Sequence, residues 1–172
     1  MVINTYWVTG TGPLHLATMP CPRGGEWLET DIRALQAECV DILVSLLTAE
    51  EITELDLSQE REQCQIHGIE YRSFPFRDHD VPPCLPALLD FAQKLERELS
   101  SGKAIAIHCR AGIGRSSLLA ACVLIIHGKS AIDAFDQIRQ ARGCQVPDTG
   151  AQFDWVEEFA LHLARERNKG PA

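Results

Sequence analysis

Apolar runs separated by turn-forming residues predict a series of short β-strands along this chain. The first two are expected at 4–8 (NTYWV) and 14–19 (LHLATM), joined as a pair by a turn rich in glycine and proline at 10–13. Later strands are expected where the chain is continuously apolar or alternates in polarity, at 41–47 (DILVSLL), 70–76 (EYRSFPF) and 103–108 (KAIAIH).

Amphipathic or strongly apolar segments between these strands predict helices. Thr30 or Asp31 can cap a helix that runs to about residue 39, and Thr48 with Glu51 has the capping-box spacing for a short helix, AEEITEL. Further helices are expected at 58–66, 86–100, 115–127, 130–141 and 150–166. The alternation of strands and helices predicts an α/β fold, a three-layer sandwich whose central, mainly parallel sheet is flanked by helices.

Length and composition indicate one globular domain over residues 1–172. The chain has 172 residues, of which 45% are hydrophobic, and contains no repeat or low-complexity tract. Its formal net charge of -8 argues against nucleic-acid binding and against recruitment to an anionic membrane, since both need a basic surface. Because neither a membrane-spanning run nor a signal-peptide pattern is found, a cytoplasmic location is expected.

Seven cysteines are spread through the chain without a C-x-x-C pair. The odd number and the spacing favour neither a disulfide framework nor a zinc site. Most of these cysteines are expected to be small buried apolar residues. Cys109 differs from the others because it ends an apolar strand and precedes a glycine-containing loop.

The stretch HCRAGIGRSS, 108–117, has the composition of an anion-binding loop between a strand and a helix. Gly112 and Gly114 allow the backbone to curl, and the helix expected to begin near Arg115 adds free N–H groups and the positive end of its dipole. The backbone from Cys109 to Arg115 would then surround a tetrahedral anion. The residues that would contribute are Arg110, Ala111, Gly112, Ile113, Gly114 and Arg115.

The side chains of this loop add a nucleophile and a cation. Arg115 can donate a fork of two hydrogen bonds to the oxygens of a phosphate. A thiol at a helix N-terminus beside an arginine is expected to be ionised at neutral pH, which places the Cys109 thiolate for attack on phosphorus. The segment FRDHDVPP supplies Asp78 and Asp80 as candidate general acids, and Ser116 can donate to the leaving thiolate.

With these residues in place, the chain resembles the cysteine-dependent protein tyrosine phosphatase superfamily, whose motif is H-C-x5-R-[ST]. The likeness is strongest to the compact dual-specificity branch and its kinase-associated phosphatase group, and it runs from about Leu14 to Phe159. It includes the segments SLLTAEE, FPFRDHDVP and GRSSLLAACVLI.

The resemblance assigns roles to individual positions. It makes Cys109 the nucleophile and, from the usual pattern P-I-P-D-x-G-x-P, it makes Asp78 rather than Asp80 the general acid. His108 would order the loop and influence the thiol. Gln152 corresponds to the second glutamine of the family's I-Q-T-x-x-Q segment, which positions the hydrolytic water, whereas Asp148 replaces the first.

The expected function is a protein phosphatase that hydrolyses phosphotyrosine, with phosphoserine and phosphothreonine also open, through a phosphocysteine intermediate. The partners are then a phosphoprotein substrate and phosphate-like anions in the 109–115 loop. No metal or cofactor is expected, because Arg115 and the loop amides supply the positive charge. Two alternatives stay open: a phosphatase of a non-protein phosphomonoester such as a phosphoinositide, and a phosphoprotein-binding module without turnover.

Overall fold

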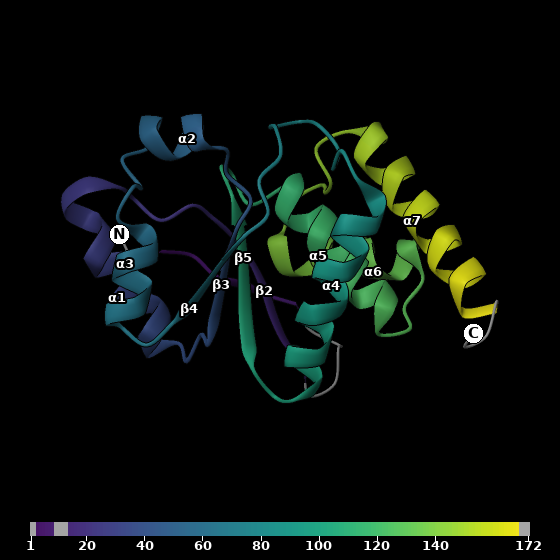
Figure 1. Ribbon diagram of the computed structural model, residues 1–172, viewed down its shortest axis with the longest axis horizontal. Helices are drawn as coiled ribbons and strands as arrows, with labels where there is room; N and C mark the ends of the chain where they lie inside the picture. Colours follow the sequence, from purple (N-terminus) through teal and green to yellow (C-terminus); the bar gives the residue numbers. More distant parts are fainter. Residues whose placement is uncertain (1–2, 9–13, 169–172) are drawn as a thin grey trace.

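The computed structural model describes residues 3–8 and 14–168 and contains a five-stranded sheet in the order β1-β2-β5-β3-β4 (Figure 1). The strands are β1 (Tyr6–Trp7), β2 (His15–Pro20), β3 (Ile42–Ser45), β4 (Glu70–Ser73) and β5 (Ala104–Cys109). β1 pairs with β2 in antiparallel orientation and the other pairs are parallel, which confirms the mainly parallel sheet. The turn predicted at 10–13 lies outside the described residues.

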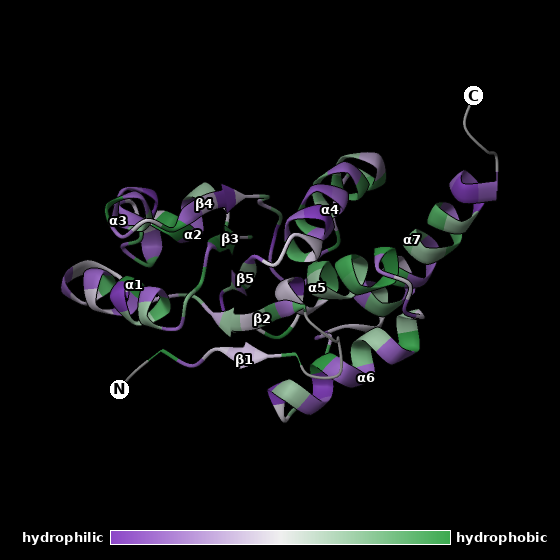
Figure 2. Ribbon diagram, turned by 90° about the horizontal axis from the view of Figure 1, so that it is seen from below, coloured by the Kyte–Doolittle hydropathy of each residue, from purple (hydrophilic) through white to green (hydrophobic). Residues whose placement is uncertain are grey.

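Helices cover both faces of this sheet, as the alternating pattern predicts (Figure 2). One face is covered by α1 (Leu28–Ala37) and α3 (Glu60–Ile66). The other is covered by α4 (Leu85–Ser100), α5 (Arg115–Ile126), α6 (Ala131–Arg142) and α7 (Gly150–Asn168). Each face has its own apolar core, so the three-layer sandwich is confirmed. Among the described residues, no helix is both long and apolar enough to cross a membrane.

Strand β5 is buried along its whole length and contributes to both cores. Ile105, Ile107 and Cys109 pack in the core beneath α4–α7, whereas Ala106 packs in the core beneath α1 and α3. Side chains alternate along a strand, so His108 faces the same side as Ala106. The side chains of His108 and Cys109 therefore leave the same strand end on opposite faces of the sheet.

The start of α1 differs from the expected cap. The helix begins at Leu28, after a 3-10 turn at Gly25–Trp27, so Thr30 and Asp31 lie inside it. The Asp31 carboxylate instead accepts hydrogen bonds from the backbone N and the Nε of Arg23, at 2.9 and 3.0 Å. The capping prediction was wrong because the helix begins three residues before Asp31, whose carboxylate binds Arg23 eight residues earlier in the chain.

Three predicted strands are shorter than expected, among them β3, which spans Ile42–Ser45 rather than 41–47. β4 ends at Ser73 rather than at residue 76, although the backbone N atoms of Phe74 and Phe76 still donate to the carbonyls of Ser45 and Leu46. The segment predicted at 4–8 pairs only at Tyr6–Trp7. By contrast, the capping box is present at the start of α2 (Ala49–Glu54), where Thr48 and Glu51 exchange hydrogen bonds.

Candidate active site

Residues 109–115 connect the carboxyl end of β5 to the first turn of α5. Gly112 has a φ of 71°, and a Cβ there would lie 2.3 Å from the carbonyl carbon of Met19 at the end of β2. A Cβ at Gly114 would lie 2.2 Å from Oδ2 of Asp148. The positive φ and the Met19 backbone therefore require glycine at position 112, whereas a side chain at position 114 would have to displace the Asp148 and Gln152 side chains.

Arg142, at the end of α6, holds the outer side of this loop. Its Nε donates to the carbonyl of Gly112 at 2.8 Å and its Nη2 donates to the carbonyl of Ala111 at 2.7 Å. The guanidinium also lies 3.9 Å from the ring centroid of Tyr6. In a trans peptide the N–H points opposite to the C=O, so these bonds direct the N–H groups of Gly112 and Ile113 away from Arg142.

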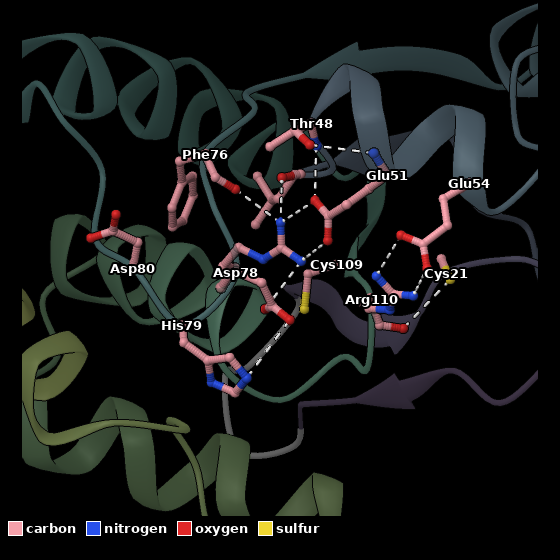
Figure 3. Close-up of polar contacts among 12 residues, drawn as sticks. Cys21, Thr48, Glu51, Glu54, Phe76, Asp78, His79, Asp80, Cys109 and Arg110 are labelled. Carbon is pink, nitrogen blue, oxygen red and sulfur yellow. Dashed lines mark hydrogen bonds and ion pairs between the residues drawn. The ribbon is translucent and has the colours of Figure 1, made fainter.

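Arg115 is fully buried at the start of α5, and several carbonyl and carboxylate oxygens converge on its guanidinium (Figure 3). Nη2 donates to Oε1 of Glu51 at 2.7 Å. Nη1 donates to Oε2 of Glu51 at 2.7 Å and to the carbonyls of Phe76 and Leu46 at 2.9 and 3.2 Å. Nε has no hydrogen-bond partner in the described part of the chain, so this donor is free for an anion.

Glu51 and Arg115 keep each other charged in the interior. Burial alone would raise the pKa of Glu51, but hydrogen bonds from Arg115 and from the Thr48 backbone hold this pKa below its usual value. Burial would lower the pKa of Arg115, whereas Glu51, Cys109 and Asp78 together raise it. Because the folded-state pKa of Glu51 is lowered, its stabilising contribution is present above about pH 4.3 and is lost as the pH falls through the folded value.

Cys109 lies at the base of the loop with only 2% of its surface exposed. Its thiol donates to the hydroxyl of Ser116, with 3.5 Å between Sγ and Oγ. The hydroxyl that was expected to serve the thiolate is therefore within reach of the sulfur. Because the same hydroxyl can reverse its role and donate to a thiolate, it suits both protonation states of Cys109.

The two candidate acids point in different directions (Figure 3). Oδ1 of Asp78 lies 3.1 Å from Nη2 of Arg115. The Asp80 carboxylate instead accepts from the backbone N of Val81 at 2.8 Å and is turned away from Cys109. Asp78 is thus the aspartate of this loop whose carboxylate lies beside Arg115, on the side of Cys109.

Gln152 joins the loop that carries the acid to the start of α7. Its side chain is fully buried, and Nε2 donates to the carbonyl of Asp80 at 3.1 Å. Oε1 accepts from the backbone N of Thr149 at 3.3 Å, while the Gln152 backbone N donates to the Thr149 hydroxyl at 3.2 Å. Gln152 therefore fastens the acid loop and caps α7, and its expected role in placing water stays a prediction.

Arg110 contributes its backbone to the loop but directs its side chain to the rim (Figure 3). Nη1 donates to Oε2 of Glu54, on α2, at 3.1 Å. Hydrogen bonding and charge attraction within this exposed pair raise the pKa of Arg110 and lower that of Glu54. The sequence left open whether this arginine faces solvent or substrate, and in the structure it is paired with Glu54.

A family model described as "Polymorphic toxin system, DSP-PTPase phosphatase" matches residues 17–129. The chain belongs to this DSP-PTPase family. Mouse protein tyrosine phosphatase domain-containing protein 1 is 34% identical over 101 residues, 59% of this chain and 13% of that protein. Rat cyclin-dependent kinase inhibitor 3 is 26% identical over 139 residues, 80% of this chain and 65% of that protein. The chain thus spans less than two thirds of either relative.

Solved structures support the DSP-PTPase fold. A kinase associated phosphatase whose catalytic-site cysteine is substituted by serine has a TM-score of 0.85 and 22% identity, covering 95% of this chain and 97% of that one. PTPMT1 in complex with PI(5)P has a TM-score of 0.72 and 19% identity, covering 89% of this chain and 94% of that one. The compact dual-specificity architecture expected from the length and layout of the chain is therefore confirmed.

Three residues near this DSP-PTPase loop were not singled out for the site from the sequence. Glu51 was recognised only as part of a capping box, and Glu54 and Arg142 lie on helices far from the loop in the chain. Only the three-dimensional structure shows that Glu51 binds Arg115, that Glu54 binds Arg110 and that Arg142 binds the loop carbonyls. One sequence signal was available for Glu51: it is an acidic residue in a short helix directly after a buried strand.

Replacing Gln152 with methionine is expected to lower kcat about tenfold, because the acid loop loses its tie to α7 while the buried volume is retained. Steady-state hydrolysis of a phosphotyrosine peptide measures this loss. Gln145→Met, at an exposed position before the same helix, is the matched control and should behave as wild type. An unchanged kcat in Gln152→Met would show that the acid loop does not need this tie.

Proposed function

We propose that this DSP-PTPase chain acts as one phosphatase domain, residues 1–172, and hydrolyses phosphomonoesters on proteins. Phosphotyrosine is the first candidate substrate, and phosphoserine and phosphothreonine are included in the proposal. The observation that carries it is the convergence on one loop of a thiol, a buried fixed arginine and a facing carboxylate: Cys109, Arg115 and Asp78. This set supplies a nucleophile, an anion-binding cation and a proton donor.

The first step proposed is transfer of the phosphoryl group to sulfur. The loop amides and the donors of Arg115 hold the nonbridging oxygens, and the Cys109 thiolate attacks phosphorus opposite the ester oxygen. The S–P bond forms as the P–O bond breaks, and Asp78 gives its proton to the departing oxygen. The product of this step is a phosphocysteine intermediate at Cys109.

The second step hydrolyses this intermediate. Asp78, now ionised, takes a proton from water as its oxygen attacks phosphorus. The S–P bond breaks, and Ser116 donates a hydrogen bond to the thiolate that leaves. Inorganic phosphate is released, and Cys109 and Asp78 return to their starting states.

Asp78→Asn is expected to reduce kcat about 100-fold or more, because an amide cannot deliver the proton to the leaving oxygen. The loss should be largest for substrates with a poorly acidic leaving group, such as phosphotyrosine, and smaller for an activated aryl phosphate. Steady-state kinetics on both substrates measure the contrast. Asp80→Asn is the matched control on the same loop, and an equal loss in both variants would contradict the assignment of Asp78.

A non-protein phosphomonoester is the second candidate substrate. The structural similarity to PTPMT1, solved with PI(5)P, favours testing a phosphoinositide. Against it, the loop offers no lysine for additional phosphates, and the rim cation Arg110 is already paired with Glu54. Phosphate release from matched phosphotyrosine, phosphothreonine and PI(5)P substrates ranks the classes. Binding of phosphopeptide without any release would favour the binding module instead.

A further inference from the structure

A buried carboxylate and a buried imidazole meet on the side of the sheet opposite the Cys109 thiol. Oε1 of Glu60, in the first turn of α3, lies 3.0 Å from Nε2 of His108, near the end of β5. Their side chains are 1% and 0% exposed, respectively. A charge so deeply buried is retained in a folded protein only when it is paired.

No other group in the described part of the chain pairs with these two side chains. Neither carboxylate oxygen of Glu60 and neither ring nitrogen of His108 makes a hydrogen bond among the described residues, so the approach of Oε1 to Nε2 at 3.0 Å is a charge contact when His108 is protonated. The charge on His108 therefore depends on Glu60 alone. Glu60 in turn has no other cation to balance it in the described residues.

The neighbouring groups show that the field of Glu60 reaches across this core. Burial and the Glu60 charge together raise the pKa of Cys21 to about 11 and that of Cys64 to about 12. The same two causes raise the pKa of Tyr71, on β4, to about 12. These three groups are neutral at physiological pH, so none of them competes for the charge of Glu60.

The cations that border this core are engaged elsewhere. Arg23 pairs with Asp31 of α1, and Arg61 of α3 stacks over the Tyr71 ring at 5.0 Å. The loop cation Arg110 pairs with Glu54. His108 is thus the group placed to balance Glu60 within the layer formed by α1, α3, β4 and β5.

We propose that Glu60 is a positioning residue that holds His108 as an imidazolium cation directly behind Cys109, an assignment that rests on the proposed function. His108 and Cys109 are adjacent in the chain at the end of β5, whereas Glu60 belongs to a helix on the far face of the sheet from the thiol. A positive charge on the residue next to Cys109 favours the thiolate form of its side chain. The sheet backbone shields the pair from solvent, so it acts in a medium of low dielectric constant.

The protonation state of His108 can be measured on the wild-type chain. Proton–nitrogen correlation spectra of the histidine side chains are recorded from pH 5 to 9, and His108 is assigned by its absence in His108→Asn. His108 is expected to show two ring N–H protons, the signature of an imidazolium, through physiological pH, because the Glu60 carboxylate lies beside it. A neutral His108 at pH 6 would overturn the proposal.

Alkylation by iodoacetamide measures the effect on the nucleophile without any phosphate substrate. The rate at Cys109 is followed by mass spectrometry of its peptide across pH, in wild type, Glu60→Gln and Glu62→Gln. Glu62 is the matched control because it lies on the exposed side of α3. In Glu60→Gln the midpoint is expected to rise by about one pH unit, which lowers the rate at pH 6 about tenfold.

The two readouts separate this proposal from the proposed function. Coincident alkylation profiles for folded Glu60→Gln and wild type would overturn the role of Glu60, whatever the chain does to phosphate esters. A normal shift in alkylation together with no phosphate release would overturn the function and leave the Glu60–His108 pair intact. If Glu60→Gln does not fold, the spectra of the wild-type chain still decide the charge of His108.

Discussion

Replacing Cys109 with serine is expected to reduce phosphate release about 10⁴-fold or more, the largest effect of any single change in this chain. A serine hydroxyl stays protonated at neutral pH, and neither Arg115 nor Ser116 can take its proton. The loop and Arg115 remain in place, so affinity for a phosphopeptide should persist. Single-turnover release and equilibrium peptide binding measure the two quantities separately.

The control for this substitution is Cys84→Ser, an exposed cysteine that precedes α4. It should retain wild-type turnover. Cys122 is a less suitable comparison because it is fully buried in α5, where burial raises the pKa of its thiol. Turnover in Cys109→Ser within a few-fold of wild type would show that another group attacks phosphorus.

Arg115→Lys is expected to lower kcat/KM about 1,000-fold, because a lysine ammonium cannot reproduce the planar fork that binds phosphate. The same change also removes the hydrogen bonds by which Arg115 is held in the protein interior. Glu51 loses its bidentate partner, and the carbonyls of Leu46 and Phe76 lose a shared donor. Incomplete pairing of this buried carboxylate should also destabilise the fold by about 2–3 kcal/mol.

Catalytic and structural losses in Arg115→Lys are separated by two measurements. Urea unfolding gives the change in the free energy of unfolding, and kinetics at a temperature where the variant is fully folded give the change in kcat/KM. Arg33→Lys, at an exposed position of α1, is the control and should alter neither quantity. If the folded variant keeps kcat/KM within tenfold of wild type, Arg115 is not the main phosphate ligand.

Local pattern was sufficient for most of the secondary structure. The apolar run at β5 and the amphipathic stripe of α4 each appear within one residue of their expected bounds, because β5 is buried on both faces and α4 on one, and each kind of burial has its own period in the sequence. The errors occurred at the ends of elements, where the period is weakest. Asp31 looks like a helix cap in the sequence, but the helix begins at Leu28 and the carboxylate binds Arg23.

In the candidate site, too, one part could be predicted from the sequence and another is seen only in the structure. The spacing from Cys109 to Arg115 and the two glycines between them lie in one continuous stretch, so the sequence alone indicates an anion-binding loop with a thiol at its base. Choosing between Asp78 and Asp80 from the residues alone was not possible, since both lie on one loop. The structure separates them by direction, because the Asp80 carboxylate accepts a hydrogen bond from the backbone N of Val81.

The sequence by itself determined the fold class, the loop and the family resemblance, since each depends on residues that are neighbours in the chain. Only the tertiary structure decided what surrounds the loop. Glu51 fixes Arg115 from behind, Arg142 holds the outer carbonyls, and Glu60 meets His108 through the core. These contacts join residues on elements far apart in the chain, and they leave no periodic trace in a single sequence because they depend on how the helices pack on the sheet and the loop.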